Sequence, residues 1–241
     1  MFDPLVMIAL AAATAAAGFL RGYSGFGGGL VMAPFFTRIV GATESVALIS
    51  LVHLMTSFQG VRKSMALIDV RVLAPLLISA VLSVPIGVYL LGTLQPHIVK
   101  AVVAVVVIVF AIAMSAGVQL PGGPTVPKSI AVGIVSGILN GFCGIGGPPA
   151  VLYVLGGQRS SDRLRASFIL FFAVLYPATV LTLALAGFVT TASVIIALVL
   201  SPIYFIATEA GRWCFQTVHS RYFVPVCTIV LCLSGLSMLV M

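Results

Sequence analysis

Residues 22–29 read GYSGFGGG and place five glycines within eight positions. The apolar stretches AAATAAAGFLR and LVMAPFF flank them on the two sides. Glycine inside a helix costs about 1 kcal/mol relative to alanine, so a cluster of this density predicts a break in the helix. One continuous helix over residues 5–40 would be about 54 Å long, far longer than a membrane-spanning helix needs to be. The glycines therefore predict a turn that sends the chain back.

The composition indicates an all-α polytopic membrane protein. Of the 241 residues, 61% are hydrophobic and 7% are charged, whereas soluble domains carry about 25% charged residues. The apolar windows at residues 99–118 and 164–185 are long enough to cross a hydrocarbon layer of about 30 Å. The net charge of +7 comes from scattered Lys and Arg residues, without the basic run that would indicate nucleic-acid binding. The four cysteines lack metal-binding spacing, so no metal site is expected.

The glycine stretch occurs twice in the chain. Residues 18–28 read GFLRGYSGFGG and residues 137–147 read GILNGFCGIGG, with six identities in eleven positions at a constant offset of 119 residues. This offset is about half the chain length, so it indicates an internal duplication. We therefore expect a first repeat over residues 1–120 and a second repeat over residues 121–241. Each repeat is predicted to be a glycine-broken helical hairpin followed by three transmembrane helices.

The apolar windows define the bounds of these segments. The first repeat has a hairpin over residues 5–40 and spans over residues 42–61, 72–94 and 99–118. The second repeat has a hairpin over residues 129–157 and spans over residues 164–187, 190–210 and 223–241. Three crossings after the first hairpin bring the second hairpin in from the opposite face, so the two repeats are expected to be inverted.

The positive charges favour this topology. It places nine Lys and Arg residues on one side of the membrane: Arg62, Lys63, Arg71, Lys128, Arg159, Arg163, Arg165, Arg212 and Arg221. The other side receives only Arg38 and Lys100, whereas an arrangement in which each glycine segment crosses once splits the charges seven to four. Because cytoplasmic loops are rich in Lys and Arg, both termini are predicted to be extracytoplasmic, with the protein in the plasma (inner) membrane.

Two glycine turns that enter from opposite faces can meet near the middle of the membrane. Broken helices in inverted repeats commonly hold a transporter's substrate there, and the helix N-terminus after each turn favours anions. The alternative interpretation is that the glycines only permit close helix packing. The candidate substrate-binding residues are Arg21, Gly22, Ser24, Gly25, Gly27, Gly28, His53, Asn140, Gly141, Cys143, Gly144, Gly146 and Gly147.

Two side chains in this set can carry a positive charge. Arg21 aligns with Asn140 and is suited either to a bidentate contact with a sulfonate-like group or to snorkelling towards the interface. His53 lies in the middle of an apolar segment, where it is a candidate proton carrier or substrate ligand; a hydrogen bond to a neighbouring helix is the alternative. The arginines of the second repeat, Arg159, Arg163 and Arg165, are interpreted as topology determinants.

The stretches GFLRGYSGFGGGLVMAPFF and GFCGIGGPPAVLYVLGGQRSSDRLRASFILFF resemble the TauE/SafE family of sulfite and organosulfonate exporters. The resemblance covers nearly the whole chain. It implies a secondary transporter of the plasma membrane for small sulfur-containing anions, without a bound cofactor. The first copy carries Gly29 and Leu30 where the second carries Pro148 and Pro149, so the two half-sites need not contribute equally.

Two other functions compete with a carrier. A passive anion channel would use similar helix ends. An intramembrane serine protease would use Ser24 of the GYSG stretch as the nucleophile and His53 as its base. The sequence leaves open the identity of the anion, the direction of transport, a coupling proton or other ion, and the formation of a homodimer.

Overall fold

The computed structural model describes residues 4–68, 70–116, 125–157 and 161–217. Regular structure in these ranges is helical throughout. The predicted span over residues 223–241 lies outside this part of the chain. The prediction of an all-α fold is therefore confirmed for the residues that the structure describes.

In the described part of the first predicted repeat, six helices are present: α1 (Pro4–Ser24), α2 (Gly28–Val40), α3 (Ala42–Thr56), α4 (Val61–Met65), α5 (Val70–Thr93) and α6 (Pro96–Ser115). The described residues of the second form four: α7 (Val126–Cys143), α8 (Gly147–Gly157), α9 (Ser161–Leu185) and α10 (Thr191–Thr217). Five of them are long and apolar enough to cross a membrane, namely α1, α5, α7, α9 and α10, and shorter apolar helices accompany them. These lengths and this composition are those of a multi-pass membrane protein.

α3 ends before the predicted limit of the 42–61 span. The hydroxyl of Thr56 donates to the carbonyl oxygen of Val52 at 3.2 Å, and the hydroxyl of Ser57 donates to that of His53. Such bonds from side chain to backbone compete with continuation of the helix. Gly60 then adopts φ 78°, which turns the chain into the short helix α4. These local bonds, rather than hydrophobicity, set the end of α3.

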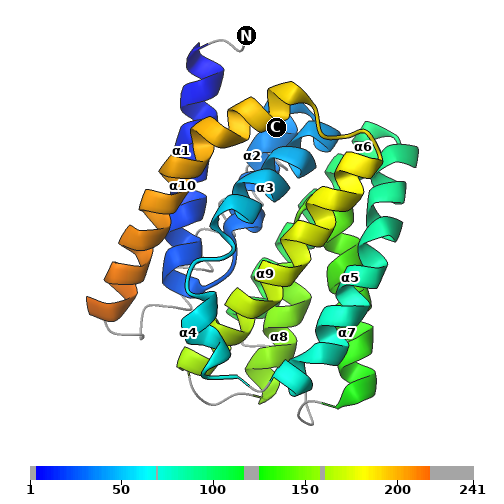
Figure 1. The fold of residues 1–241 in the computed structure, drawn as a ribbon. Coiled ribbons are helices and arrows are strands. Elements are labelled where there is room, and N and C mark those ends of the chain that lie inside the picture. Colours follow the sequence, from blue (N-terminus) through cyan, green and yellow to red (C-terminus); the bar gives the residue numbers. More distant parts are fainter. Residues whose placement is uncertain (1–3, 69, 117–124, 158–160, 218–241) are drawn as a thin grey trace.

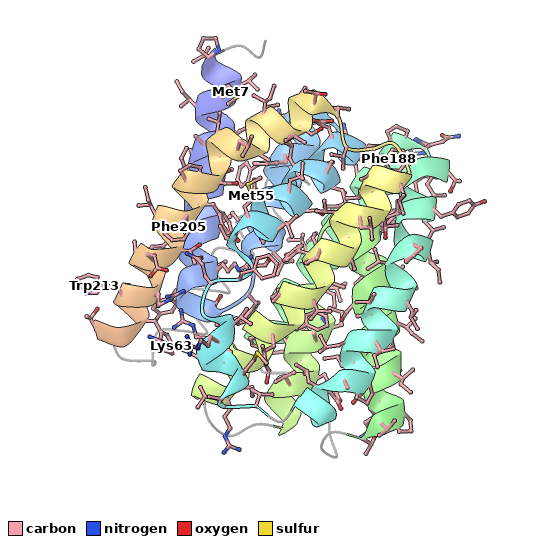
Figure 2. The ribbon with its side chains drawn as sticks, viewed as in Figure 1. Met7, Met55, Lys63, Phe188, Phe205 and Trp213 are labelled. Atoms are coloured by element: carbon pink, nitrogen blue, oxygen red, sulfur yellow. The ribbon has the colours of Figure 1, made fainter. Side chains whose placement is uncertain are left out.

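The short helices that follow the two turns, α2 and α8, lie at different ends of the molecule. In Figure 1, α1 starts beside the N-terminus at the upper end of the molecule and α2 lies in the upper half, whereas α4 and α8 lie at the lower end. The outer surface of the bundle is apolar: Phe205 and Trp213 of α10 are 46% and 68% exposed and project outward in Figure 2. In a membrane protein such side chains face lipid.

Two helix pairs make closely matched contacts through glycine. α1 packs along α10, where a Cβ atom at Gly22 would lie 2.0 Å from the carbonyl oxygen of Thr208. α7 packs along α5, where a Cβ atom at Gly141 would lie 2.4 Å from the carbonyl oxygen of Val84. Gly22 and Gly141 are the aligned positions of the two sequence copies. In each case a helix that ends in a glycine turn packs against a helix of the other predicted repeat.

The same correspondence appears on the partner helices. A Cβ atom at Gly211 of α10 would lie 2.1 Å from the carbonyl oxygen of Phe19, and one at Gly87 of α5 would lie 2.1 Å from that of Ile138. Phe19 and Ile138 are again aligned positions of the two copies. Small residues on both members of a pair allow the backbones to approach closely. The two pairs therefore hold the two glycine turns in similar packing environments.

Candidate functional site

The first glycine turn, residues 25–27, connects α1 to α2. Gly25 and Gly27 have φ values of 85° and 89°, a left-handed conformation that residues with a Cβ atom rarely adopt. The amide of Gly25 donates to the carbonyl oxygen of Arg21 at 2.7 Å and closes the last turn of α1. Glycine is therefore required at both positions for the chain to reverse within three residues.

The second turn, residues 144–146, connects α7 to α8. Gly144 has φ 70°, and its amide donates to the carbonyl oxygen of Asn140 at 2.9 Å. A Cβ atom at Gly146 would lie 2.6 Å from the Cβ atom of Asn140 and 2.8 Å from the carbonyl oxygen of Ser136. Here the chain needs glycine both for its backbone angle and for close contact with the preceding helix.

The two turns lie against each other in the interior of the bundle. A Cβ atom at Gly29 would lie 2.5 Å from the carbonyl oxygen of Gly144, so the backbones themselves are in contact. Every residue of both turns is buried. The N-termini of α2 and α8, at Gly28 and Gly147, are therefore close to one shared region, and backbone amides at helix N-termini favour negative charge.

Arg21, in the last turn of α1, is a buried charge beside this region. Its side chain is 8% exposed. Its guanidinium carbon lies 5.7 Å from the ring centroids of Phe172 and Tyr176 on α9 and 5.9 Å from that of Tyr204 on α10. Aromatic faces attract a cation, but they do not accept hydrogen bonds as a carboxylate or a sulfur oxyanion does. Within the described part of the chain, Nη1 of Arg21 is buried and has no hydrogen-bond partner.

His53 of α3 lies against the same aromatic rings. It is 1% exposed and stacks on Tyr176 with ring centroids 4.6 Å apart. Its Nδ1 atom lies 2.7 Å from the carbonyl oxygen of Ile49, and its Nε2 atom lies 2.8 Å from the hydroxyl oxygen of Tyr204. A Cβ atom at Gly28 would lie 2.7 Å from Nε2 and 2.2 Å from the Tyr204 hydroxyl. Arg21, His53 and Tyr204 therefore gather at the N-terminus of α2.

Asn140, which aligns with Arg21, has both ends of its side-chain amide occupied. Nδ2 donates to the hydroxyl of Thr179 on α9 at 2.7 Å, and Oδ1 accepts from the amide of Gly146 at 3.2 Å. At the N-terminus of α8, a Cβ atom at Gly147 would meet the ring of Phe172 at 2.9 Å. The second turn is therefore fastened by internal hydrogen bonds and faces an apolar ring.

Ser24 and Cys143 bond to their own backbone. The Ser24 hydroxyl lies 2.7 Å and 2.6 Å from the carbonyl oxygens of Leu20 and Phe26 and accepts from the amide of Phe26. The Cys143 thiol donates to the carbonyl oxygen of Leu139 at 3.1 Å. Since His53 faces Tyr204 and Ile49, it does not form the base-to-nucleophile contact that a serine protease needs.

Gly22 and Gly141 have a different environment from the turn glycines. Each meets the backbone of a packed helix, at Thr208 and Val84 respectively. The alternative of close helix packing therefore describes these two positions. Of the candidate residues, the structure brings Arg21, Gly28 and His53 together with Tyr204, places the other turn residues beside them, and leaves Gly22 and Gly141 at helix crossings.

Several residues in and beside this cluster were missed from the sequence. Arg165 of α9, interpreted as a topology determinant, donates from Nη2 to the carbonyl oxygen of Gly22 and lies 5.1 Å from the ring of Phe215. Phe172, Tyr176 and Tyr204 lie within long apolar windows, where aromatic residues are common lipid-facing or packing residues. For Phe172 the sequence offers one signal, which is its alignment with His53 at the offset of 119 residues.

Comparison with known proteins identifies the family. A family model described as sulfite exporter TauE/SafE matches residues 10–238, which include both glycine turns and the residues around Arg21. No curated protein and no solved structure matches the chain. Members of this family are transporters and not enzymes, so the protease alternative is set aside. The chain belongs to the TauE/SafE family, which are multi-pass membrane proteins that transport sulfite and related sulfur-containing anions.

Proposed function

We propose that the protein is a secondary transporter that moves one small sulfur-containing anion at a time across the plasma membrane by alternating access. The observation that carries this proposal is the buried Nη1 of Arg21, which has no hydrogen-bond partner in the described part of the chain. A charge in the membrane interior costs about 2.5–3.5 kcal/mol on insertion scales. A binding site for an anion explains why the protein retains such a charge.

The surroundings of Arg21 favour a small oxyanion as the ligand. The helix N-terminus at Gly28 presents backbone amides, and a planar guanidinium donates two parallel hydrogen bonds to carboxylate-like or sulfonate-like oxygens. The rings of Phe172, Tyr176 and Tyr204 lie around the charge, and the Arg21 side chain is buried. Interactions between charges become stronger where water is excluded. The proposed ligand set is therefore Arg21 with the backbone of residues 25–28, opposite the turn at residues 144–147.

Burial supports a carrier over an open channel. Arg21, His53, Gly28 and Gly147 are all buried in this conformation, so an anion reaches them only after neighbouring helices move. The matched pairs, α1 on α10 and α7 on α5, each join one helix from each predicted repeat, so we propose that each pair moves as one rigid unit around a fixed centre. We also propose that the repeats 1–120 and 121–241 have inverted orientations in the membrane.

Binding and counterflow test the function. Purified protein is screened for melting temperature with sulfite, thiosulfate, methanesulfonate and taurine, because a ligand that prefers the native state raises the melting temperature. Proteoliposomes loaded with an unlabelled stabilising anion then receive the same anion labelled outside. A carrier exchanges the two, so internal anion accelerates labelled uptake and the rate saturates. Uptake that grows linearly with concentration and is not stimulated from inside would favour the channel, and stabilisation by none of these anions would contradict the site.

Cysteine labelling tests the orientation. In a background without native cysteines, a cysteine at Leu5 or Gln95 is expected to react with an impermeant thiol reagent added to intact cells. A cysteine at Met65 or Val126 is expected to react only after the cells are opened. All four positions are exposed, so burial does not limit the reaction. The reverse pattern would place both termini in the cytoplasm.

A further inference from the structure

His53 is surrounded by four helices. Arg21 from α1, Tyr176 from α9 and Tyr204 from α10 are the ionisable side chains that face it in the described part of the chain, and α2 contributes the backbone of Gly28. Arg21 and His53 contact the same two tyrosine rings. A charge on His53 is therefore placed close to the permanent charge of Arg21.

The hydrogen bonds of His53 determine which atoms can donate. The carbonyl oxygen of Ile49 is only an acceptor, so Nδ1 at 2.7 Å carries a proton. In a neutral imidazole, Nε2 is then an acceptor, and the Tyr204 hydroxyl at 2.8 Å donates to it. In this state the hydroxyl is used by His53 and is not free to donate to a ligand near Gly28.

A proton on His53 reverses this bond. Nε2 becomes a donor to the Tyr204 oxygen, because both nitrogens of a charged imidazole donate. The O–H of Tyr204 is then released and can rotate towards another acceptor. The hydroxyl lies 2.2 Å from the position that a Cβ atom of Gly28 would take, at the N-terminus of α2, so the acceptor within reach is the anion held by Arg21.

We propose that a proton on His53 and an anion on Arg21 bind together, with the Tyr204 hydroxyl as the link between the two sites. The proposal rests on the function proposed above. The proton comes from water, binds Nε2, and leaves again to water when the anion leaves, so no covalent change remains. Two neighbouring positive charges repel each other, and an anion between them removes that penalty. By linkage, the proton then strengthens anion binding by the same factor as the anion strengthens proton binding.

This coupling predicts that proton and anion move in the same direction. The test uses methanesulfonate and thiosulfate, whose charge does not change between about pH 5 and about pH 8, the range in which histidine side chains titrate. Any pH dependence of their binding therefore belongs to the protein. Binding of each anion to the purified full-length protein is measured across this range, and proton uptake on mixing is followed with a pH dye in weak buffer.

For the wild-type protein, the affinity is expected to rise as the pH falls, by up to about tenfold per pH unit for one linked proton. Proton uptake should accompany binding. In H53Q the affinity should become independent of pH and proton uptake should disappear. In Y204F, which keeps His53 but removes the linking hydroxyl, the pH dependence should become weaker. H97Q and Y89F alter exposed residues of the same types and should behave as the wild type does.

The outcomes separate the two proposals. Binding that depends on Arg21 but is independent of pH and takes up no proton would overturn the coupling and leave the proposed function intact. Retention of the full pH dependence in H53Q would also overturn it. Absence of binding of both anions to the wild-type protein would contradict the proposed function, and the coupling with it. If H53Q fails to fold, proton uptake by the wild type and the behaviour of Y204F still decide the question.

Discussion

The two glycine turns share their spacing and their contact with each other, yet their side chains differ completely. At aligned positions, the first turn carries Arg21 and faces His53, whereas the second carries Asn140 and faces Phe172. Among the residues that the structure describes, Nη1 of Arg21 is a buried donor without a partner, whereas both polar ends of Asn140 are bonded. The first copy of the glycine stretch therefore carries the charge, and the polar groups of Asn140 in the second copy are used within the protein.

The difference indicates how the two copies of the glycine stretch divide backbone geometry and side-chain chemistry. Backbone geometry needs glycine in both copies, because each turn reverses the chain next to the other. The guanidinium of Arg21 already supplies a charged donor at the proposed site, so the second copy does not need one at the aligned position. A second buried arginine would add the cost of another unpaired charge. A single buried arginine, in the first copy only, therefore avoids this additional cost in stability.

The largest effect is expected from breaking both turns. Gly27→Val places a β-branched residue at φ 89°, and Gly146→Val forces a side chain into Asn140. A displacement of about 1 Å at a site can reduce its function on the order of a hundredfold, so both variants should lose most anion transport in proteoliposomes. Gly187→Val is the control, because Gly187 has φ 76° and no atom of the described residues lies within 4 Å of its Cβ position. The purified variants are checked for monodispersity. Near-normal transport by both would show that the turn glycines serve only helix packing.

The next test compares the aligned residues of the two glycine stretches, Arg21 and Asn140. Arg21→Gln removes hydrogen bonds to a charged group, worth about 1.5–3 kcal/mol, so anion affinity should fall about tenfold to about a hundredfold. Its melting temperature without anion should not fall, because an unpaired buried charge has been removed. Asn140→Ala should do the opposite, lowering the melting temperature through two lost hydrogen bonds and changing affinity less. Arg38→Gln, at an exposed position of α2, is the control for Arg21→Gln. Equal losses of affinity at positions 21 and 140 would make the two halves equivalent.

Much of this arrangement was predictable from residue pattern. Glycine density and helix length predicted the turns, since both depend on local backbone chemistry. The offset of 119 residues pairs Arg21 with Asn140 from the sequence alone. The partners of Arg21 were not predictable, because Tyr176 and Tyr204 come from helices distant in the chain and look like ordinary apolar positions. The end of α3 at Thr56 was missed because hydroxyl bonds to the backbone do not alter a hydropathy window.

A smaller effect is expected at Arg165, which contacts the helix end that leads into the first turn. Its hydrogen bond to the carbonyl oxygen of Gly22 satisfies one of the last carbonyls of α1, which have no partner within the helix. Arg165→Gln should lower thermal stability by about 1–3 kcal/mol and reduce transport moderately, because the same turn carries Arg21. Arg163→Gln changes an exposed residue of the same helix and should have little effect. A loss of transport without loss of stability in Arg165→Gln would instead indicate a ligand.

The smallest effect is expected from the hydroxyl of Ser24. It bridges Leu20 and Phe26 within the turn, so it ties the backbone together and does not point a free donor at the centre. Ser24→Ala should cost about 1 kcal/mol of stability and leave anion affinity within about twofold of wild type. Cys143→Ser places the same hydroxyl at the aligned position of the second turn, where the thiol now bonds Leu139, and should be neutral. If folded Ser24→Ala loses transport while Cys143→Ala does not, the hydroxyl is a ligand, and the first turn binds the anion through its side chains as well as its backbone.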